Sequence, residues 1–206
     1  MDKIKILIAC EESQTVCIAF RKLGFEAFSC DIMPCSGGHP EWHIQDDALK
    51  HLNDGWDLMI AFPPCTYLTN TGNRWRKIPG RNEKSIEAYK FFFKLWNCNI
   101  PKICIENPVG TVNHYFQPAQ IIQPWMFGEK FQKRTCLWLF NLPELIPTNI
   151  VDKGEFIYAK NGKRMPKWYS DARWDKKKRS KTFPGIAEAM AKQWGDYLNG
   201  TMPKKN

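Results

Sequence analysis

Short, continuously apolar runs alternate with segments of helical periodicity along this chain, and that alternation restricts its fold more than any other feature. Apolar runs without polar alternation are typical of strands that are buried on both faces of a parallel sheet. Two segments between these runs, 16–23 and 83–97, have the spacing of amphipathic helices. The order of strand, helix, strand, strand, helix, strand predicts a doubly wound α/β sheet. The apolar runs are residues 4–9, 25–32, 56–62 and 102–107.

Both predicted helices carry local signals. Gly24 follows the first helix, and glycine readily adopts the left-handed conformation that ends a helix. The second helix has an apolar stripe that we expect to face the sheet. The stripe consists of Ile86, Tyr89, Phe92, Phe93 and Trp96.

Composition limits the class of protein. The chain has 206 residues, of which 43% are hydrophobic, enough for one globular domain with a full core. It has neither an apolar run that could cross a bilayer nor a signal-peptide pattern, so we expect a cytoplasmic protein. The eight cysteines form no CxxC pair, and we expect reduced thiols. The formal net charge of +9 favours a polyanionic partner such as nucleic acid, although a basic protein without that role fits equally well.

Three parts of the chain differ in pattern. Residues 1–142 contain the predicted sheet and form the predicted core. Residues 143–182, called the lobe below, are rich in proline, lysine, tryptophan and tyrosine and have few periodic apolar positions. Residues 183–206 regain helical periodicity at 186–198 and end in a tail that we expect to be frayed. We therefore predict a core, a small basic lobe and a closing helix that returns to the core.

Reactive and polar side chains follow the predicted strands. In open α/β sheets, ligands bind at the carboxyl ends of the strands. The turn with Cys10 and Glu11 follows the first strand, where a nucleotide-like cofactor usually lies. Asp31 ends the second strand and could bind ribose hydroxyls, although an ordinary strand-end cap is the simpler role. Cys65 and Glu106 end the next two strands.

A thiol and a carboxylic acid at adjacent strand ends suit one reaction. Pro63 and Pro64 stop the strand, so Cys65 lies in a loop beyond it. Carbon 5 of cytosine is a poor nucleophile until a thiolate adds to C6, and an acid near N3 assists that addition. Cys65 could be the nucleophile and Glu106 the acid. The simpler interpretations are an inert buried thiol and a structural carboxylate.

Taken together, these segments resemble the DNA cytosine C5-methyltransferases, in particular the compact kind found in phages and prophages. The resemblance covers roughly residues 4–142 and 183–198. It implies a Rossmann-like class I methyltransferase sheet with helices on both faces. The similar segments are "FPPCTYLTNTG" (62–72, nucleophile loop), "IENP" (105–108, ENV motif), "FQKRTCLW" (131–138, QxRxR strand) and "FPGIAEAMAKQW" (183–194, final helix).

The resemblance implies transfer of a methyl group from S-adenosylmethionine to C5 of cytosine in DNA. Cys65 would attack C6, and Glu106 would assist at N3. Gln132 and Arg134 match the QxRxR strand, where the arginine would steady the base or the nucleophile loop and the glutamine would support the strand. Cys136 replaces the last arginine of that motif.

The cofactor residues come partly from the resemblance. "WHIQDDAL" (42–49) is similar to the segment whose acidic residue hydrogen-bonds the adenine, and Asp47 is the best match, with Asp46 beside it. The residues predicted to contact S-adenosylmethionine are Cys10, Glu11, Asp31, Ile32, Asp47 and Pro63.

The chain departs from the family pattern at two places. The family's first turn is rich in glycine, whereas "ACEESQ" (9–14) has none, so no glycine there lets the backbone approach a ligand closely. DNA-specific relatives also carry a separate target-recognition domain, for which only residues 139–182 are available here.

Basic residues lie among aromatic residues in the lobe, and more follow the nucleophile loop. That combination suits phosphates and stacked bases, and a duplex substrate would also require base flipping. The simpler interpretation is a solvated basic loop over packed aromatic side chains. The residues predicted to bind nucleic acid are Arg74, Arg76, Lys77, Lys167, Trp168, Arg173, Lys177 and Arg179.

A possible metal pattern also occurs. Cys30, Cys35, His39 and His43 are spaced as C-x4-C-x3-H-x3-H, and zinc can use such ligands. Because Cys30 lies inside a predicted strand and its neighbour Asp31 is needed at the cofactor, we predict no metal site.

Three alternatives stay open. The same chemistry could act on a free nucleotide or use an altered one-carbon donor, which would explain the short lobe and the missing glycines. The chain could instead be a catalytically silent nucleic-acid-binding protein that shields DNA or antagonises a host factor. An amino-methyltransferase is disfavoured, because an aromatic residue follows the two prolines in those enzymes and Cys65 stands there.

Overall fold

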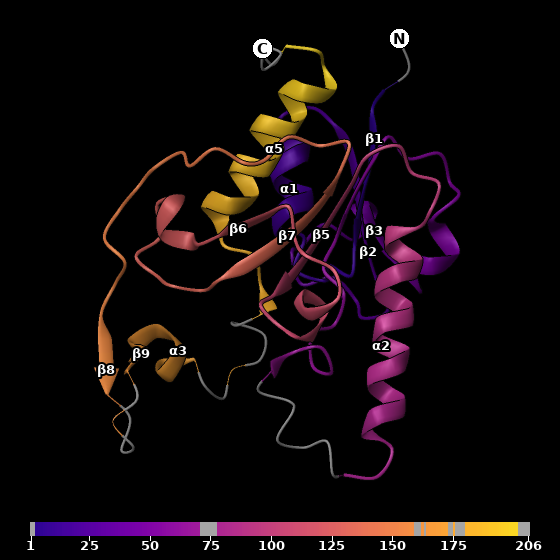
Figure 1. The fold of residues 1–206 in the computed structure, drawn as a ribbon. Coiled ribbons are helices and arrows are strands. Elements are labelled where there is room, and N and C mark those ends of the chain that lie inside the picture. The colour runs from indigo at the N-terminus through magenta and orange to yellow at the C-terminus, as the bar shows by residue number, and fades with distance from the viewer. Residues whose placement is uncertain are drawn as a thin grey trace.

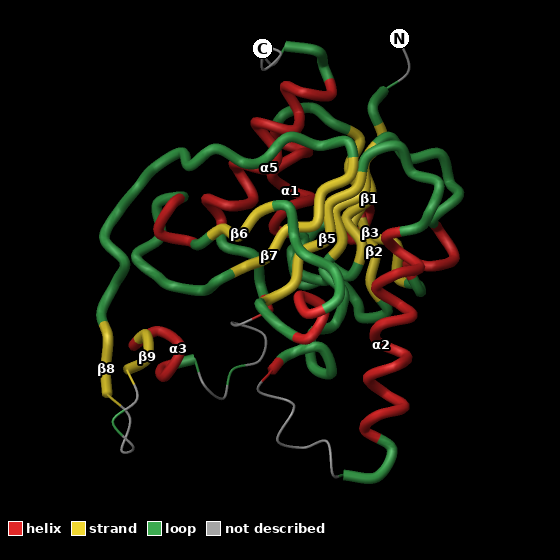
Figure 2. The backbone as a smooth tube through the Cα atoms, in the orientation of Figure 1, coloured by secondary structure: helices red, strands yellow, loops and turns green. Residues whose placement is uncertain are grey.

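A computed structural model of the chain describes residues 3–70, 78–158, 162, 164–172, 175 and 180–201. A seven-stranded sheet in the order β3-β2-β1-β4-β5-β7-β6 forms its centre (Figures 1 and 2). Strand β7 pairs antiparallel with both of its neighbours, and the other strands share one direction. The strands are β1 Lys5–Ala9, β2 Glu26–Asp31, β3 His43–Gln45, β4 Leu58–Ala61, β5 Ile103–Pro108, β6 Gln120–Ile122 and β7 Thr135–Phe140.

Helices cover both faces of this sheet. Helices α1 (Thr15–Lys22) and α5 (Pro184–Leu198) pack together on one face, and α2 (Arg81–Trp96) covers the other (Figure 1). This arrangement follows from the apolar strand runs, because each needs a hydrophobic layer on both sides. Short 3₁₀ turns connect the larger elements. They are η1 Pro40–Trp42, η2 Ala48–His51, η4 Thr111–His114 and η5 Pro124–Met126.

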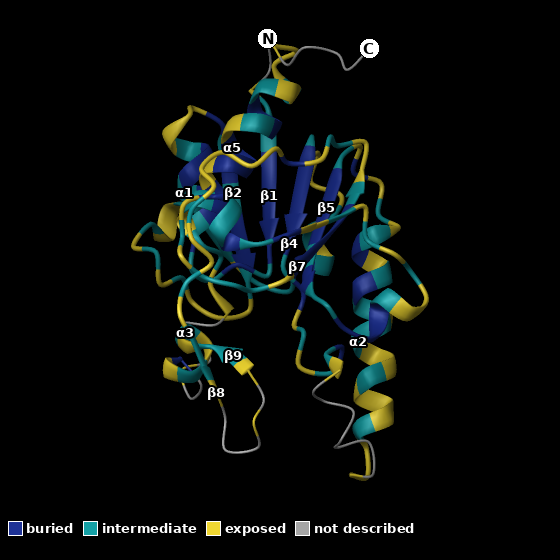
Figure 3. Cartoon of the chain, turned by 60° about the vertical axis from the view of Figure 1, so that its left-hand side comes forward, coloured by how far each residue is buried: buried dark blue, intermediate teal, exposed yellow. Residues whose placement is uncertain are grey.

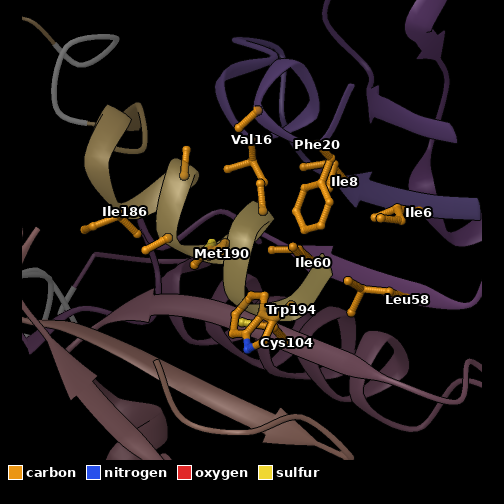
Figure 4. Close-up of a cluster of buried hydrophobic side chains, with 14 of the residues drawn as sticks. Ile6, Ile8, Val16, Phe20, Leu58, Ile60, Cys104, Ile186, Met190 and Trp194 are labelled. Atoms are coloured by element: carbon orange, nitrogen blue, oxygen red, sulfur yellow. The ribbon is translucent and has the colours of Figure 1, made fainter. Parts of the chain in front are cut away.

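The closing helix α5 completes the core on the α1 face. Figure 4 shows Met190 and Trp194 of α5 next to Ile60 of β4 and close to Phe20 of α1. Trp194 is fully buried, and its indole N–H donates to the Pro143 carbonyl at 3.0 Å. Burial of each such side chain stabilises the fold by roughly 1.5–3 kcal/mol. Helix α5 therefore belongs to the same hydrophobic core as the sheet.

The predicted helices and strands of the core are confirmed within about two residues. Gly24 has a φ of 86°, as expected for a residue that ends α1. The predicted stripe on α2 is wrong at Ile86, which is 53% exposed. The first half of α2 extends past the carboxyl ends of the strands (Figure 3), so the sheet cannot cover that residue.

The lobe contains a second, two-stranded sheet and a short helix. Its described elements are β8 (Phe156–Tyr158), β9 (Arg164–Pro166) and α3 (Lys167–Asp171). Figures 1 and 3 show these elements projecting beyond the carboxyl ends of the strands, on the side opposite α2. The carboxyl edge of the large sheet therefore lies between two projecting parts.

Two further observations concern the whole described chain. All eight cysteines are free thiols. Among the described residues, none of the helices combines the length and the apolar character that crossing a membrane requires.

Candidate active site at the carboxyl edge of the sheet

Strands β4 and β5 bring Cys65 and Glu106 to the same edge. The two strands are parallel, and Ala61 pairs with Ile105. Glu106 is the next residue of β5, and Cys65 follows Ala61 by four residues in the loop that leaves β4. The sequence prediction that a thiol and a carboxylic acid share this edge agrees with the register.

The described part of the nucleophile loop, residues 62–70, makes a tight turn at Cys65. The Cys65 carbonyl accepts hydrogen bonds from the backbone N–H groups of Leu68 (2.9 Å) and Thr69 (3.1 Å). Pro63 is buried, whereas Pro64 is exposed and Cys65 is half-buried. The two prolines thus end the strand, and the turn presents the thiol at its start.

Residues that follow Glu106 fasten this loop. The Asn107 side-chain amide donates to the Pro63 carbonyl at 2.9 Å in a buried hydrogen bond. The backbone N–H (2.7 Å) and hydroxyl (3.0 Å) of Thr111 both donate to the Leu68 carbonyl. At Gly110 an added Cβ would lie 2.1 Å from the same Leu68 oxygen, so only glycine fits there. One segment of the chain therefore carries the acid and also positions the nucleophile loop.

The environment of Glu106 favours its protonated form. Burial raises the pKa of its carboxyl group, and the Lys133 ammonium and a hydrogen bond from the Thr135 side chain oppose that rise. A carboxylic acid that keeps its proton closer to neutral pH is suited to donate it.

Lys133, and not Arg134, acts electrostatically on Glu106. Glu106 pairs with Leu137, and side chains alternate along β7. Thr135 and Leu137 thus share one face, and Lys133, two residues before Thr135, acts on Glu106 from that side. Arg134 is exposed and acts on the Cys136 thiol instead. The sequence analysis missed Lys133, although the period of two along the strand is the signal that could have found it.

At the other two positions of the QxRxR segment, the structure shows one backbone contact and one core thiol. The Gln132 carbonyl accepts a hydrogen bond from the Trp168 indole at 3.0 Å. Cys136 is buried, and the Asn113 side chain donates to its sulfur at 3.3 Å. In this chain the position of the missing arginine is filled by a core thiol.

The first turn is built without glycine. Cys10 and Gln14 adopt positive φ values of 60° and 58°, which glycine usually supplies. The Glu11 carboxylate turns inward and accepts hydrogen bonds from Val16 N (2.7 Å) and Cys17 N (3.2 Å) at the start of α1. Burial raises the pKa of Glu11 to about 8. Its carboxylate thus caps α1, and the predicted contact of Glu11 with a cofactor stays a prediction.

A cavity of about 810 Å³ opens between the strand ends and α2. Four of the six predicted cofactor residues line it, namely Cys10, Asp31, Ile32 and Asp47. Pro63 is buried and does not line the cavity, whereas its exposed neighbour Pro64 does. The sequence analysis did not identify the opposite wall, which Tyr67 and the α2 residues Glu83, Lys84, Glu87, Ala88, Lys90, Phe91 and Lys94 form.

Two carboxylates of the cavity are held in fixed orientations. The Oδ1 atom of Asp31 accepts from Met33 N at 2.9 Å, and that of Asp47 accepts from Leu49 N at 3.0 Å. The second oxygen of each carboxylate could accept a hydrogen bond from a ligand hydroxyl or amine. Exposed Ile32 supplies an apolar surface next to Asp31. The cavity therefore presents two oriented carboxylates beside an apolar surface.

The two described residues of the predicted nucleic-acid set have partners inside the protein. Lys167 pairs with Glu155 at 2.6 Å. Trp168 packs against the rings of Phe131 and Phe183, each with centroids 5.7 Å from its own. Trp168 therefore docks the lobe onto the core, and its predicted contact with nucleic acid stays a prediction. The predicted residues Arg74, Arg76, Lys77, Arg173, Lys177 and Arg179 lie outside the described residues.

The C-x4-C-x3-H-x3-H residues have separate partners. His43 Nδ1 lies 2.8 Å from Ser29 Oγ, and the His39 ring stacks on Trp42 at 3.9 Å. The Cys30 thiol donates to the Asp46 carbonyl at 3.5 Å. Within the described part of the chain, His, Cys, Asp and Glu side chains form no cluster of three or more that could bind a metal ion.

Comparison with known proteins supports the fold. No protein-family model and no curated protein sequence matches the chain. Among solved structures, the chain is similar to the Entamoeba histolytica methyltransferase EhMeth, with a TM-score of 0.52 and 12% identity. The match covers 73% of this chain and 58% of that one, so this chain spans little more than half of its neighbour's length. The Rossmann-like methyltransferase fold predicted from the sequence is confirmed.

Proposed function

We propose that this protein transfers a methyl group to C5 of cytosine in DNA, through a covalent bond between Cys65 and C6 of the base. The observation that carries the proposal is the fastening of the nucleophile loop to the segment with the acid. Asn107 and Thr111 hold the loop on both sides of Cys65, through the carbonyls of Pro63 and Leu68. Such preorganisation is what an attack at one ring carbon with protonation at a ring nitrogen requires.

Each bond and proton in the proposed reaction has a source and a destination. The Cys65 thiolate forms a bond with C6 while Glu106 shares its proton with N3, and C5 becomes nucleophilic. As C5 gains the methyl group, the bond from that methyl to the donor sulfur would break and leave its electron pair on sulfur. C5 would then lose its proton to a water molecule acting as base, the electron pair of the C5–H bond would form the C5–C6 double bond, the Cys65–C6 bond would break to give back the thiolate, and N3 would return its proton to Glu106. Glu106 suits this role because its raised pKa keeps a proton available, and Lys133 keeps that pKa from rising further.

The cavity supports S-adenosylmethionine as the donor. Asp31 would bind the ribose hydroxyls, Asp47 the adenine amine, and Ile32 the adenine face. The sulfonium of the bound donor supplies an electrophilic methyl group. The amino-acid end would lie toward Cys10, whose positive φ turns the backbone there.

The test is mass spectrometry of nucleosides after incubation with S-adenosylmethionine and duplex DNA, single-stranded DNA or dCMP. We expect 5-methylcytosine from DNA, and no product with Cys65→Ala. A product from dCMP alone would favour the free-nucleotide alternative. Absence of product from all three would contradict methyl transfer, and DNA binding unchanged by Cys65→Ala would then favour the silent DNA-binding protein.

A trapping experiment tests the covalent step separately. DNA with 5-fluorocytosine cannot lose a proton from C5 after methyl transfer, so the Cys65–C6 bond should persist. We expect one covalent adduct, and peptide mass spectrometry should place it on Cys65. An adduct on another of the eight cysteines would show that the nucleophile is assigned wrongly.

A further inference from the structure

The lobe contacts the core at Lys130 and Gln132, on both sides of Phe131. The next residue along the chain is Lys133, which acts on the candidate acid Glu106. On one side, Gly154 has a φ of +80°, and an added Cβ would lie 2.0 Å from the Lys130 carbonyl oxygen. On the other side, the Trp168 indole donates to the Gln132 carbonyl at 3.0 Å. Two separate parts of the lobe thus hold the backbone from Lys130 to Gln132.

An aromatic cluster completes this docking. The rings of Phe131, Trp168 and Phe183 lie 5.6–5.7 Å apart, pair by pair. Phe183 directly precedes α5, so the cluster joins the lobe to the closing helix as well as to the strand entry. Aromatic pairs at such distances stabilise a contact beyond the apolar area that they bury.

Lys133 connects this cluster with the acid. Its ammonium lies 5.9 Å from the centroid of the Phe183 ring, within the range of a cation–π contact. The Thr135 hydroxyl oxygen lies 3.3 Å from the Lys133 carbonyl oxygen, and the same side chain contacts Glu106. The Lys133 ammonium thus contacts Phe183 of the aromatic cluster. Its backbone carbonyl contacts Thr135, which also contacts Glu106.

We propose that Trp168 is a positioning residue: it seats the lobe on residues 130–132 and so keeps the Lys133 ammonium beside Phe183, on the side of the strand that faces Glu106. The lobe is then part of the active site and more than a surface for the substrate. This inference rests on the proposed role of Glu106.

The lobe's contacts with residues 130–132 give this coupling a direct route. Lys133 is the next residue along the chain, and a lysine stem without a fixed backbone has many positions open to it. Loss of the Trp168 contacts should let the Lys133 ammonium move away from Glu106, and the acid should weaken.

The experiment measures the Glu106 carboxyl directly by ¹³C NMR titration of glutamate-labelled protein. Lys133→Met should raise the pKa of Glu106 by about one pH unit, since a nearby opposite charge is lost. Trp168→Ala should raise it in the same direction. Trp168→Phe should give a smaller rise, because it keeps the ring and loses only the hydrogen bond to Gln132. The matched control is Tyr158→Ala, because Tyr158 lies in the same lobe and is 73% exposed.

Kinetics supply the second readout. Trp168→Ala should lower kcat about 10- to 100-fold, with a smaller change in KM for DNA, because the acid is displaced while the substrate still binds. The alkaline limb of the pH–rate profile should move together with the NMR titration.

An unchanged Glu106 titration in both Trp168 variants would overturn the inference, and so would an equal change in Tyr158→Ala. If Trp168→Ala does not fold, the titration of Trp168→Phe decides. The NMR titration requires no turnover. Failure of the proposed methyl transfer would therefore appear as wild-type protein without product, and it could not be mistaken for failure of this coupling.

Discussion

Two loops at the carboxyl edge of the sheet are held in different ways. In the first turn, the backbone N–H groups of Cys10 and Glu11 donate to the Cys30 carbonyl, and the turn's own side chains add further contacts. Glu11 caps α1, and the Gln14 amide bonds to His39 and Ser29. In the nucleophile loop, the contacts reach backbone carbonyls, those of Pro63 and Leu68.

The difference shows how a loop can be prepared for chemistry. When neighbouring residues hold the backbone of a loop, its side chains need not hold the loop in place. When its own side chains do that work, as Glu11 and Gln14 do, they are less free to bind a ligand. The Cys65 thiol therefore lies in the loop whose backbone is held from outside, whereas Glu11 and Gln14 of the first turn hold the structure and Cys10 alone of that turn lines the cavity.

The largest expected effect is that of Cys65→Ala. If the backbone contacts alone shape the nucleophile loop, the variant should lose at least about 10³-fold in methyl transfer. Its free energy of unfolding should change by less than about 1 kcal/mol. Nucleoside mass spectrometry and urea unfolding measure the two quantities. A large loss of stability would mean that the thiol shapes the loop, and the comparison would fail.

Glu106→Gln should lower the rate about 10²- to 10⁴-fold, because it removes the acid and keeps the shape. The wild-type rate should fall as pH rises through the pKa of Glu106, which burial has raised above the usual range. The glutamine variant should lack that fall. A pH–rate profile of both proteins is the measurement, and the same alkaline limb in the variant would exclude Glu106 as the titrating acid.

Glu11→Gln tests the first turn through its stability. The pKa of Glu11 rises from 4.5 to about 8 on folding, so its contribution is fully present below pH 4.5 and declines as pH rises toward 8. The variant does not titrate. Its stability relative to wild type should therefore improve by roughly 3–4 kcal/mol between pH 5 and pH 8.

Urea unfolding at several pH values measures this difference, with methyl transfer as the control. A difference that does not change with pH would show that the Glu11 carboxylate is ionised in the folded protein. It would then resemble a ligand-binding carboxylate more than a buried cap.

Thr111→Val should have the smallest effect. It removes one of the two hydrogen bonds from Thr111 to the Leu68 carbonyl and keeps the shape, so we expect a loss of about 1 kcal/mol. The methylation rate should fall only a few-fold, because the backbone N–H still holds the loop. A loss of rate as large as that of Glu106→Gln would show that this single hydroxyl positions Cys65.

The fold and the two reacting groups follow largely from local sequence. Continuous apolar runs, two helical periods and a Pro-Pro-Cys turn each depend on neighbouring residues, and neighbours determine strand, helix and turn. Parallel strands then bring their carboxyl ends to one edge whatever the details of packing. For these reasons the sequence alone is enough to put Cys65, Glu106 and Asp31 at the same edge.

Tertiary structure decided which partner each polar group has. Alternation along β7 shows that Lys133 and Arg134 point to opposite faces, but only the pairing of Leu137 with Glu106 shows which face meets the acid. Glu11 and Trp168 carry groups suited to ligands, and packing assigns them to α1 and to Gln132. Sequence by itself determined the elements and the chemistry at their ends. The contacts between distant segments determined which of those groups are available, because a buried polar group bonds to whatever the fold places next to it.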